Sequence, residues 1–423
     1  MHTSEHNEPL KLRGTILCPD GLLEGEVTIR DGVITEINRQ EASNVADAAN
    51  PQRGGEVASK SEQFILPGFA DVHNHGGAGE SFPTSDLEGC AKAARHHRAH
   101  GTTTLLASTV SMKEPVLLPQ LSLLAELAQE GLIAGIHAEG PFVNACRCGA
   151  QDPDAIIEGD PELFAKMLKA SKGHLRSITL APETANIEAL VHACAEHNVI
   201  VSFGHSDADF EQAARAIDYA HTAGATITAT HLFNAMPPLH HRNPGVAAAM
   251  IEAAGRGVAA VELIADGVHL SDHTVAMLME TLGPDHITFV SDAMGAAGKA
   301  DGDYMLGALA VQVRDGVARL RTEDGAAGAI AGGTSRIIDQ VRRQVAYGHS
   351  LESVVRAATT GHELLGLPSG LKVGNPADIV VCSPDFEVRE VLSKGQSVRA
   401  PEQQPESVRA PEQHLEQPQH PTG

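Results

Sequence analysis

Short apolar runs rich in β-branched residues recur along the middle of this chain, and alanine-rich stretches separate them. Near-continuous apolar strands are typical of a parallel sheet that helices bury on both faces. Eight such alternating units predict an α/β fold of one kind, the (β/α)8 TIM barrel. The eight runs cover residues 64–75, 101–109, 131–142, 177–183, 199–206, 225–235, 258–269 and 286–294.

The two ends of the chain carry strand patterns of a different kind. Residues 27–37 (VTIRDGVITEI) alternate around Asp31 and Gly32, a pair typical of a β-hairpin turn. Residues 377–398 have a similar pattern. Because neither piece is long enough to enclose a core, we expect both ends to meet in one small β domain. The predicted parts are residues 1–63 and 371–398 in the small domain and residues 64–370 in the barrel.

Three further patterns set local expectations. Residues 311–320 (VQVRDGVARL) predict a second hairpin, outside the barrel, after the eighth strand. Ser206 and Asp209 predict a capping box at the start of the next helix. Residues 399–423 are rich in Pro, Gln and Glu and carry most of a duplicated SVRAPEQ. Such a composition cannot bury a core, so we expect a disordered tail, with a partner-binding tail as the alternative.

The charge balance and the cysteines argue against several classes of protein. With 31 Lys and Arg against 54 Asp and Glu, the net charge is −23. Binding nucleic acid needs clustered basic residues, so we expect no nucleic-acid partner. No apolar run reaches the roughly eighteen residues of a membrane span, and the polar N-terminus lacks the apolar core of a signal peptide. Six scattered cysteines fit a reducing compartment, so we expect a cytoplasmic protein with no membrane partner.

Several of the eight runs end in a side chain that can bind a metal ion or transfer a proton. Residues i and i+2 of an extended strand point to the same side, so His73 and His75 should project together. The catalytic residues of a barrel lie at the C-terminal ends of its strands, where they converge on one mouth. Each residue alone could be a cap or a hydrogen-bonded core residue, but together they predict a metal site. The set is His73, His75, Glu139, His205, His231 and Asp292.

The residue types indicate the chemistry of this site. Imidazole and carboxylate ligands without a thiolate suit a divalent ion, Zn²⁺ first and Fe²⁺ or another divalent ion next. Such an ion lowers the pKa of a bound water toward neutrality and so supplies a nucleophile. Asp292 stands apart in VSDAM, and we expect it to take a proton from the water and hand it to the leaving group.

The motifs that carry these residues resemble the amidohydrolase superfamily. HNH after PGFADV, together with GIHAEGPF, GHSDA, THLFNAMPPLHHRNPG, ADGVH and VSDAM, is similar in particular to its N-acetylglucosamine-6-phosphate deacetylases, over about residues 10–395. The resemblance implies a (β/α)8 barrel, a small β-sandwich domain built from both chain ends, and a homodimer. It also implies hydrolysis of the N-acetyl group of a phosphorylated amino sugar, N-acetylglucosamine 6-phosphate, to glucosamine 6-phosphate and acetate.

The resemblance also implies roles for single residues. Glu139, His205 and His231 correspond to the principal metal ligands. His73 and His75 correspond to the second site of binuclear members, which gives one or two ions per subunit, and Asp292 corresponds to the catalytic aspartate. The implied substrate contacts are Asn234 and Ala235 to the phosphate, Arg242 to the phosphate in the neighbouring subunit, and His269 to the substrate.

Two features depart from the family pattern. Gln151 stands where the family commonly has a histidine, and it can bind a sugar hydroxyl or phosphate but carries no charge. This leaves open a related metal amidohydrolase that acts on another N-acyl group or a cyclic amide. Cys146 and Cys148 flank Arg147 in the same loop, and we expect ordinary thiols there, with an extra ligand pair or a redox switch as alternatives. A non-catalytic barrel is disfavoured because no ligand is missing.

Overall fold

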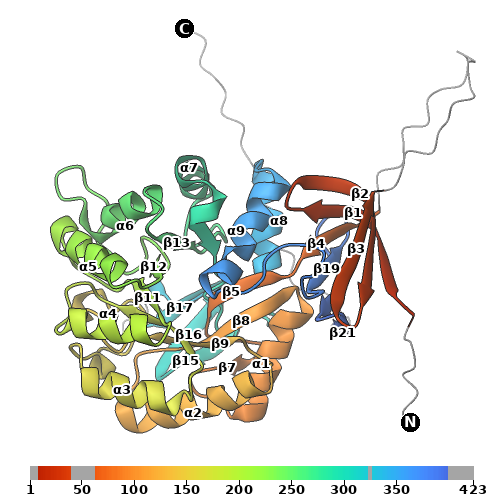
Figure 1. The fold of residues 1–423 in the computed structure, drawn as a ribbon. Helices are drawn as coiled ribbons and strands as arrows, with labels where there is room; N and C mark the ends of the chain where they lie inside the picture. The colour runs from red at the N-terminus through yellow and green to blue at the C-terminus, as the bar shows by residue number, and fades with distance from the viewer. Residues whose placement is uncertain (1–7, 40–61, 323–325, 399–423) are drawn as a thin grey trace, which may run out of the picture.

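The computed structural model describes residues 8–39, 62–322 and 326–398, and its largest part is a barrel of strands surrounded by helices (Figure 1). Parallel strands follow one another in the order β14-β13-β12-β11-β10-β9-β8-β5. The backbone N–H of Asp292 donates to the His73 carbonyl (2.9 Å) and that of His75 to the Ala293 carbonyl (2.7 Å), which joins the two outer strands. The predicted (β/α)8 barrel is confirmed. Its strands are β5 (Phe69–Asn74), β8 (Thr102–Thr109), β9 (Gly135–Glu139), β10 (Leu175–Leu180), β11 (Ile200–Phe203), β12 (Ile227–Ala229), β13 (Ala260–Leu263) and β14 (Ile287–Phe289).

Amphipathic helices cover the outside of the barrel (Figure 1). In α5 the buried residues Ala213, Ala216, Ile217 and Ala220 recur at helical spacing, so one face packs on the strands and the other meets solvent. The helices are α1 (Leu87–Ala99), α2 (Glu114–Gln129), α3 (Pro161–Ala170), α4 (Ile187–Glu196), α5 (Phe210–Thr222), α6 (Gly245–Gly255), α7 (Asp272–Leu282), α8 (Ile337–Tyr347) and α9 (Leu351–Leu364).

Helix α5 begins after Asp209, which is its N-cap. The Asp209 carboxylate accepts from the Gln212 N–H at 2.7 Å, and the Gln212 side chain accepts from the Asp209 N–H at 3.3 Å, so these two residues form the capping box. The prediction of a box from Ser206 to Asp209 is therefore wrong. The Ser206 hydroxyl instead donates to Glu183 Oε2 at 2.7 Å, which holds Ser206 in the loop before the helix.

Both ends of the chain meet in a second sheet beside the barrel, as the strand patterns predicted. Its strands lie in the order β21-β20-β19-β4-β1-β2-β3, and Figure 1 shows β1 to β3 in red, β4 in orange and β19 and β21 in blue. A separate apolar cluster supports it, which includes Ile16, Val27, Ile65 and Ile379. The strands are β1 (Leu10–Cys18), β2 (Gly21–Arg30), β3 (Val33–Arg39), β4 (Phe64–Pro67), β19 (Ile379–Cys382), β20 (Val388–Ser393) and β21 (Gln396–Val398).

The run 64–75, predicted as one barrel strand, is divided at Gly68 between the two sheets. Strand β4 pairs with β1 and β19 in the small sheet, and β5 pairs with β8 in the barrel. The Gly68 N–H donates to the Asp378 carbonyl at 2.9 Å. A Cβ atom at this position would lie 2.2 Å from Thr103 Oγ1, so only glycine fits where the chain crosses from one sheet to the other.

A small antiparallel sheet follows the eighth barrel strand, where a hairpin outside the barrel was predicted. It consists of β15 (Gly302–Leu306), β16 (Leu309–Arg314), β17 (Val317–Arg321) and β18 (Ala327–Ile330). Asp315 and Gly316 form the predicted turn with φ of 50° and 72°, in the left-handed region that this two-residue turn requires. Leu306 and Ile330 of this sheet line the cavity at the barrel mouth.

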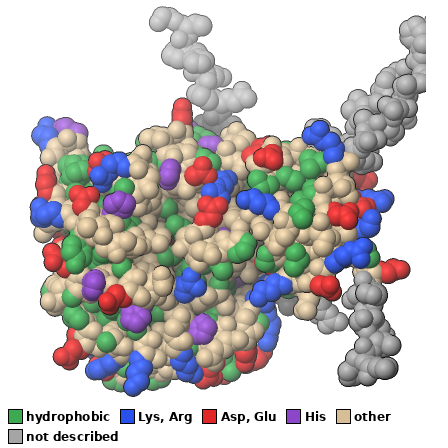
Figure 2. Space-filling model, in the orientation of Figure 1, with side chains coloured by type: hydrophobic (Ala, Val, Ile, Leu, Met, Phe, Trp, Pro, Cys, Tyr) green, Lys and Arg blue, Asp and Glu red, His purple; other side chains and the backbone are tan. Residues whose placement is uncertain are grey.

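Acidic and basic side chains are interspersed over the face drawn in Figure 2, so the net charge of −23 is not gathered into one patch there. Within the described ranges, no helix has both the length and the apolar character needed to cross a membrane. The predicted disordered tail, 399–423, lies outside the described residues.

Candidate metal centre

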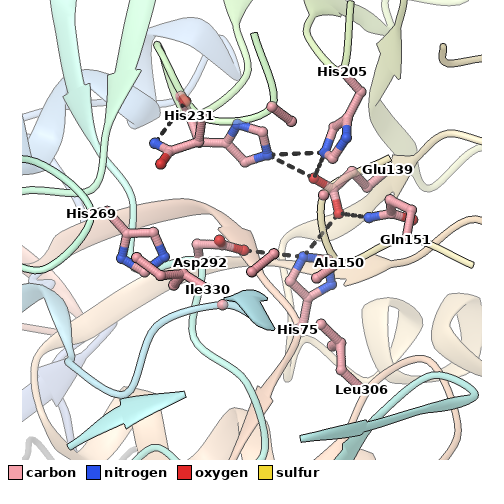
Figure 3. Close-up of a pocket in the computed structure, with 15 residues that line it drawn as sticks. His75, Glu139, Ala150, Gln151, His205, His231, His269, Asp292, Leu306 and Ile330 are labelled. Atoms are coloured by element: carbon pink, nitrogen blue, oxygen red, sulfur yellow. Dashed lines mark hydrogen bonds and ion pairs between the residues drawn. The ribbon is translucent and has the colours of Figure 1, made fainter. Parts of the chain in front are cut away.

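The strand-end side chains converge on one cavity of about 220 Å³ (Figure 3). Glu139 is the last residue of β9, and His205, His231 and Asp292 follow closely after β11, β12 and β14. His73 lies in β5 and is fully buried. The cavity lining includes His75, Glu139, His205, His231 and Asp292.

Three of these residues have an unusual backbone conformation. The φ angles of His205, His231 and Asp292 are 47°, 27° and 46°, in the left-handed region that residues other than glycine seldom adopt. Such conformations cost free energy and cluster where a side chain must be aimed for function. Their concentration around one cavity marks it as the functional site of the barrel.

Glu139, His205 and His231 form one group of converging donor atoms. The Nδ1–H of His205 donates to the Arg147 carbonyl (2.8 Å), which leaves a lone pair on Nε2 in the neutral ring. This Nε2 lies 2.9 Å from Glu139 Oε1 and 3.1 Å from His231 Nε2, and His231 Nε2 is also 2.9 Å from Glu139 Oε1. Lone pairs at this spacing repel one another unless a cation lies among them. The donor set therefore fits a metal ion.

His73, His75 and Glu139 form a second group. The two Nε2 atoms lie 3.1 Å apart, so the side chains project together as their spacing predicted. His75 Nε2 is 3.3 Å from Glu139 Oε2, while His73 Nε2 is 3.5 Å from Oε1. Because Glu139 belongs to both groups, its carboxylate could bridge two ions.

The electrostatics of the cavity also fit a cation. Burial would raise the pKa of the Glu139 carboxyl, but the neighbouring imidazoles of His73 and His205 hold that pKa well below its usual range. Burial would lower the pKa of His73, but Glu139 and Glu262 raise it well above its usual value. Both shifts arise because buried carboxylates are stabilised by positive charge beside them. A divalent ion would supply charge of that sign.

Asp292 lies between His75 and His269 in the cavity (Figure 3). Its Oδ1 is 3.2 Å from His75 Nε2 and 3.5 Å from His73 Nε2. Burial would raise its pKa, but the hydrogen bond from His75 and the charges of both histidines lower it to about 2. The carboxylate is therefore ionised and held next to the second ligand group.

Most of the residues that the family resemblance placed at the substrate are in the same cavity. Asn234, Ala235 and His269 line it. The His269 ring is oriented by a 2.8 Å hydrogen bond between Nδ1 and Asp266 Oδ2. Arg242 does not reach this cavity within its own chain, because it lies exposed on the loop after Ala235.

Gln151 lines the cavity, but both ends of its amide bind protein groups. Its Nε2 donates to Glu139 Oε2, and its Oε1 accepts the Ser111 N–H. The side chain is 4% exposed. Gln151 thus holds the Glu139 carboxylate, which both ligand groups share. The family resemblance, which implied a sugar or phosphate contact for Gln151, did not predict this role.

Two other contacts to the ligand groups were not predicted. Glu262 lies 3.2 Å from His73 Nδ1, and the Arg147 carbonyl accepts from His205. Glu262 could have been noticed in the sequence, since it is a lone carboxylate within an apolar strand. The contact of the Arg147 carbonyl could not, because every residue has a backbone carbonyl. Cys146 is exposed and Cys148 half-buried, and among the described residues neither belongs to a cluster that could hold a metal.

A sequence model of the amidohydrolase family matches residues 64–398. The chain belongs to the amidohydrolase family. The N-acetylglucosamine-6-phosphate deacetylase of Lysinibacillus sphaericus is 32% identical over 380 residues, covering 88% of this chain and 92% of that one. The N-acetylgalactosamine-6-phosphate deacetylase of Escherichia coli O157:H7 is 30% identical over 392 residues, covering 90% and 97%.

A solved structure is similar over nearly the whole of this amidohydrolase. It is a mutant of the N-acetyl-D-glucosamine-6-phosphate deacetylase of Mycobacterium smegmatis in complex with N-acetyl-D-glucosamine-6-phosphate. The TM-score is 0.82 with 36% sequence identity, over 93% of this chain and 100% of that one. The family prediction is confirmed, and the chain is an enzyme with two His/Glu groups that could hold metal ions.

Proposed function

We propose that this amidohydrolase hydrolyses the N-acetyl group of N-acetylglucosamine 6-phosphate and releases glucosamine 6-phosphate and acetate, a step of amino-sugar breakdown. The observation that carries the proposal is the similarity to the Mycobacterium smegmatis deacetylase, with 36% identity over 93% of this chain. The cavity supports it, since it contains ligand groups for a divalent ion and an aspartate beside them, the groups that amide hydrolysis needs.

We assign proton transfer to Asp292. A divalent ion held by Glu139, His205 and His231 would polarise the amide carbonyl and make a water molecule more acidic. The ionised Asp292 would accept the proton of the attacking water at a carboxylate oxygen and then give it to the leaving amine. Asp292 Oδ1 lies 3.2 Å from His75 Nε2, so the carboxylate is placed directly beside the ligand groups.

We assign the second ligand group, His73 and His75 with the shared Glu139, to a second ion. Zn²⁺ is the ion that this set of imidazoles and carboxylates suits first, and Fe²⁺ suits it next.

We further propose a homodimer in which Arg242 binds the phosphate of a substrate held by the other subunit. Arg242 is exposed, and among the described residues no carboxylate forms an ion pair with it. A guanidinium can bind two phosphate oxygens at once. Asn234, Ala235 and His269 are the substrate contacts within the subunit's own cavity.

A second candidate substrate is another N-acyl compound, such as the galactosamine epimer. It is favoured by the 30% identity to the Escherichia coli deacetylase of N-acetylgalactosamine 6-phosphate. Gln151 carries no charge, and a cyclic amide substrate is the other form of this second candidate.

The proposal is tested by measuring the acetate that the metal-loaded protein releases from N-acetylglucosamine 6-phosphate, from its galactosamine epimer and from the unphosphorylated sugar. Ring opening of a cyclic amide is measured in parallel. We expect the largest kcat/KM on N-acetylglucosamine 6-phosphate. A larger value on the epimer or the cyclic amide would favour the second candidate, and no turnover of any of them would refute both.

We also propose a cytoplasmic location. All six cysteines are free thiols, which a reducing compartment preserves.

A further inference from the structure

Glu262 in β13 is a buried carboxylate that contacts both ligand groups. Its Oε2 accepts from His73 Nδ1 and from the backbone N–H of His231, each at 3.2 Å. Its Oε1 accepts from the hydroxyls of Ser202 and Thr228, also at 3.2 Å each. Glu262 is 2% exposed, so these four donors take the place of solvent around it.

A chain of buried hydrogen bonds leads to Glu262 from the end of β5, by way of β8, β9 and β10. It begins at the backbone N–H of Asn74, which donates to the Ser108 hydroxyl at 2.9 Å. Ser108 Oγ is 2.9 Å from His137 Nδ1, and His137 Nε2 is 2.9 Å from Thr179 Oγ1. These links cross from β5 to β10.

The remaining links lead from β10 to β13. Thr179 Oγ1 lies 2.9 Å from Thr230 Oγ1, which lies 2.6 Å from Ser202 Oγ, the donor to Glu262. Glu262 Oε2 accepts the backbone N–H of His231, a group that can only donate. Connected hydrogen bonds of this kind strengthen one another. Oε2 is therefore placed as an acceptor toward His73 as well.

An acceptor at this place decides which nitrogen of His73 carries the proton. His73 must present Nδ1–H to Glu262, and in the neutral ring that binds a metal ion the Nε2 lone pair then faces His75 Nε2 at 3.1 Å and Glu139 Oε1 at 3.5 Å. A carboxylate behind a metal-bound histidine orients the ring and makes it a better ligand. We propose that Glu262 is the positioning residue of the metal centre, which fixes the tautomer of His73 and links it to the strand end that carries His231.

Metal titration of the chelator-treated protein tests this inference, which rests on the proposed metal site. The ion that His73 binds is identified as the one lost in His73→Ala. Glu262→Gln keeps an oxygen for His73 Nδ1, so affinity for this ion should fall roughly tenfold, whereas Glu262→Leu removes the acceptor and should lower it roughly a hundredfold. Glu363→Gln makes the same acid-to-amide change at an exposed pair with Arg356 and should leave the affinity unchanged.

Three results would overturn the inference. The first is a metal affinity that neither Glu262 variant changes. The second is an equal loss of metal affinity in both variants, together with a lowered Tm of the metal-free protein. The third is a His73→Ala variant that still binds every ion. If Glu262→Leu does not fold, Glu262→Gln alone tests the inference, through its metal affinity and the absorption spectrum of its bound Co²⁺. An affinity and a spectrum that both match those of the unmodified protein would exclude a positioning role. Failure of the unmodified protein to bind any divalent ion is a different outcome, which refutes the metal site itself.

Discussion

Asp292 combines a left-handed backbone with a carboxylate that can transfer a proton. Asparagine keeps the size of the side chain and tolerates the φ of 46°, but it cannot accept the proton. We expect Asp292→Asn to fold and to bind metal as the unmodified protein does, with kcat lower by about 10²–10⁴-fold. Acetate release and metal content measure the two effects. Activity within about tenfold of the unmodified enzyme would contradict the assignment of proton transfer to Asp292.

Gln151 makes a prediction about stability, because both ends of its buried amide are occupied. Gln151→Met keeps the length of the side chain but leaves the Ser111 N–H and Glu139 Oε2 without these partners. We expect the free energy of unfolding to fall by about 1–3 kcal/mol, measured by urea denaturation. Gln312→Met on β16 loses only a long 3.4 Å contact at the surface and serves as the control. A loss no larger than that of the control would refute the structural role of Gln151.

At this scale the sequence predicted positions better than contacts. His73, His75, Glu139, His205, His231 and Asp292 could be selected because each ends a strand, and the barrel brings strand ends to one cavity. The partners that orient them could not be predicted from the pattern. Glu262 lies within an apolar run where a carboxylate has no local partner, and its four donors come from three other strands or their ends.

Strands and helices could be predicted where the apolar pattern repeats regularly. Their ends were predicted less well where a single residue changes the direction of the chain. The eight runs correspond to the eight barrel strands because each is apolar on both faces. The division of the first run depends on the close approach of Gly68 to Thr103, and the start of α5 depends on the attachment of Ser206 to Glu183. Both are contacts between segments, so no local pattern contains them.

The end of β5 carries a prediction about the number of metal ions. The unmodified protein, loaded with excess divalent ion, should bind two equivalents, and His73→Ala with His75→Ala should bind one, because the other group keeps Glu139, His205 and His231. Elemental analysis after gel filtration measures the ratio. In a control variant, alanine replaces His192 and His197, two exposed histidines away from the cavity. This variant should still bind two equivalents of metal. A single equivalent in the saturated, unmodified protein would argue against the second ion.

The proposed dimer makes a prediction for the whole molecule. If Arg242 binds phosphate in the other subunit, Arg242→Ala should raise KM for the phosphorylated sugar by roughly ten- to a hundredfold, since a charged bidentate contact is worth about 1.5–3 kcal/mol. Turnover of the unphosphorylated sugar, which lacks that contact, should not change. Steady-state kinetics on the two sugars separate these effects.

Mixing two impaired variants, assayed on the phosphorylated sugar at a concentration below KM, tests where Arg242 acts. In a dimer of one Arg242→Ala chain and one Asp292→Asn chain, one cavity has an intact Asp292 and receives an intact Arg242 from its neighbour. Activity should therefore partly return on mixing. If proven heterodimers are no more active than the separate variants, Arg242 acts within its own subunit or not on phosphate.

The small sheet has a consequence for how the molecule is made. Strand β4 lies between β1, near the start of the chain, and β19 (Ile379–Cys382), near its end, and both ends supply the core beneath the sheet. A ribosome adds about 5–20 residues per second, so tens of seconds separate the emergence of β4 from that of its neighbour β19. During this interval the sheet of β1 to β4 has an unpaired edge at β4, and its apolar side chains lack the part of the core that the C-terminal strands supply. We expect chaperones to engage the nascent chain at these strands, and a ribosome that stalls before residue 379 to release a product that aggregates.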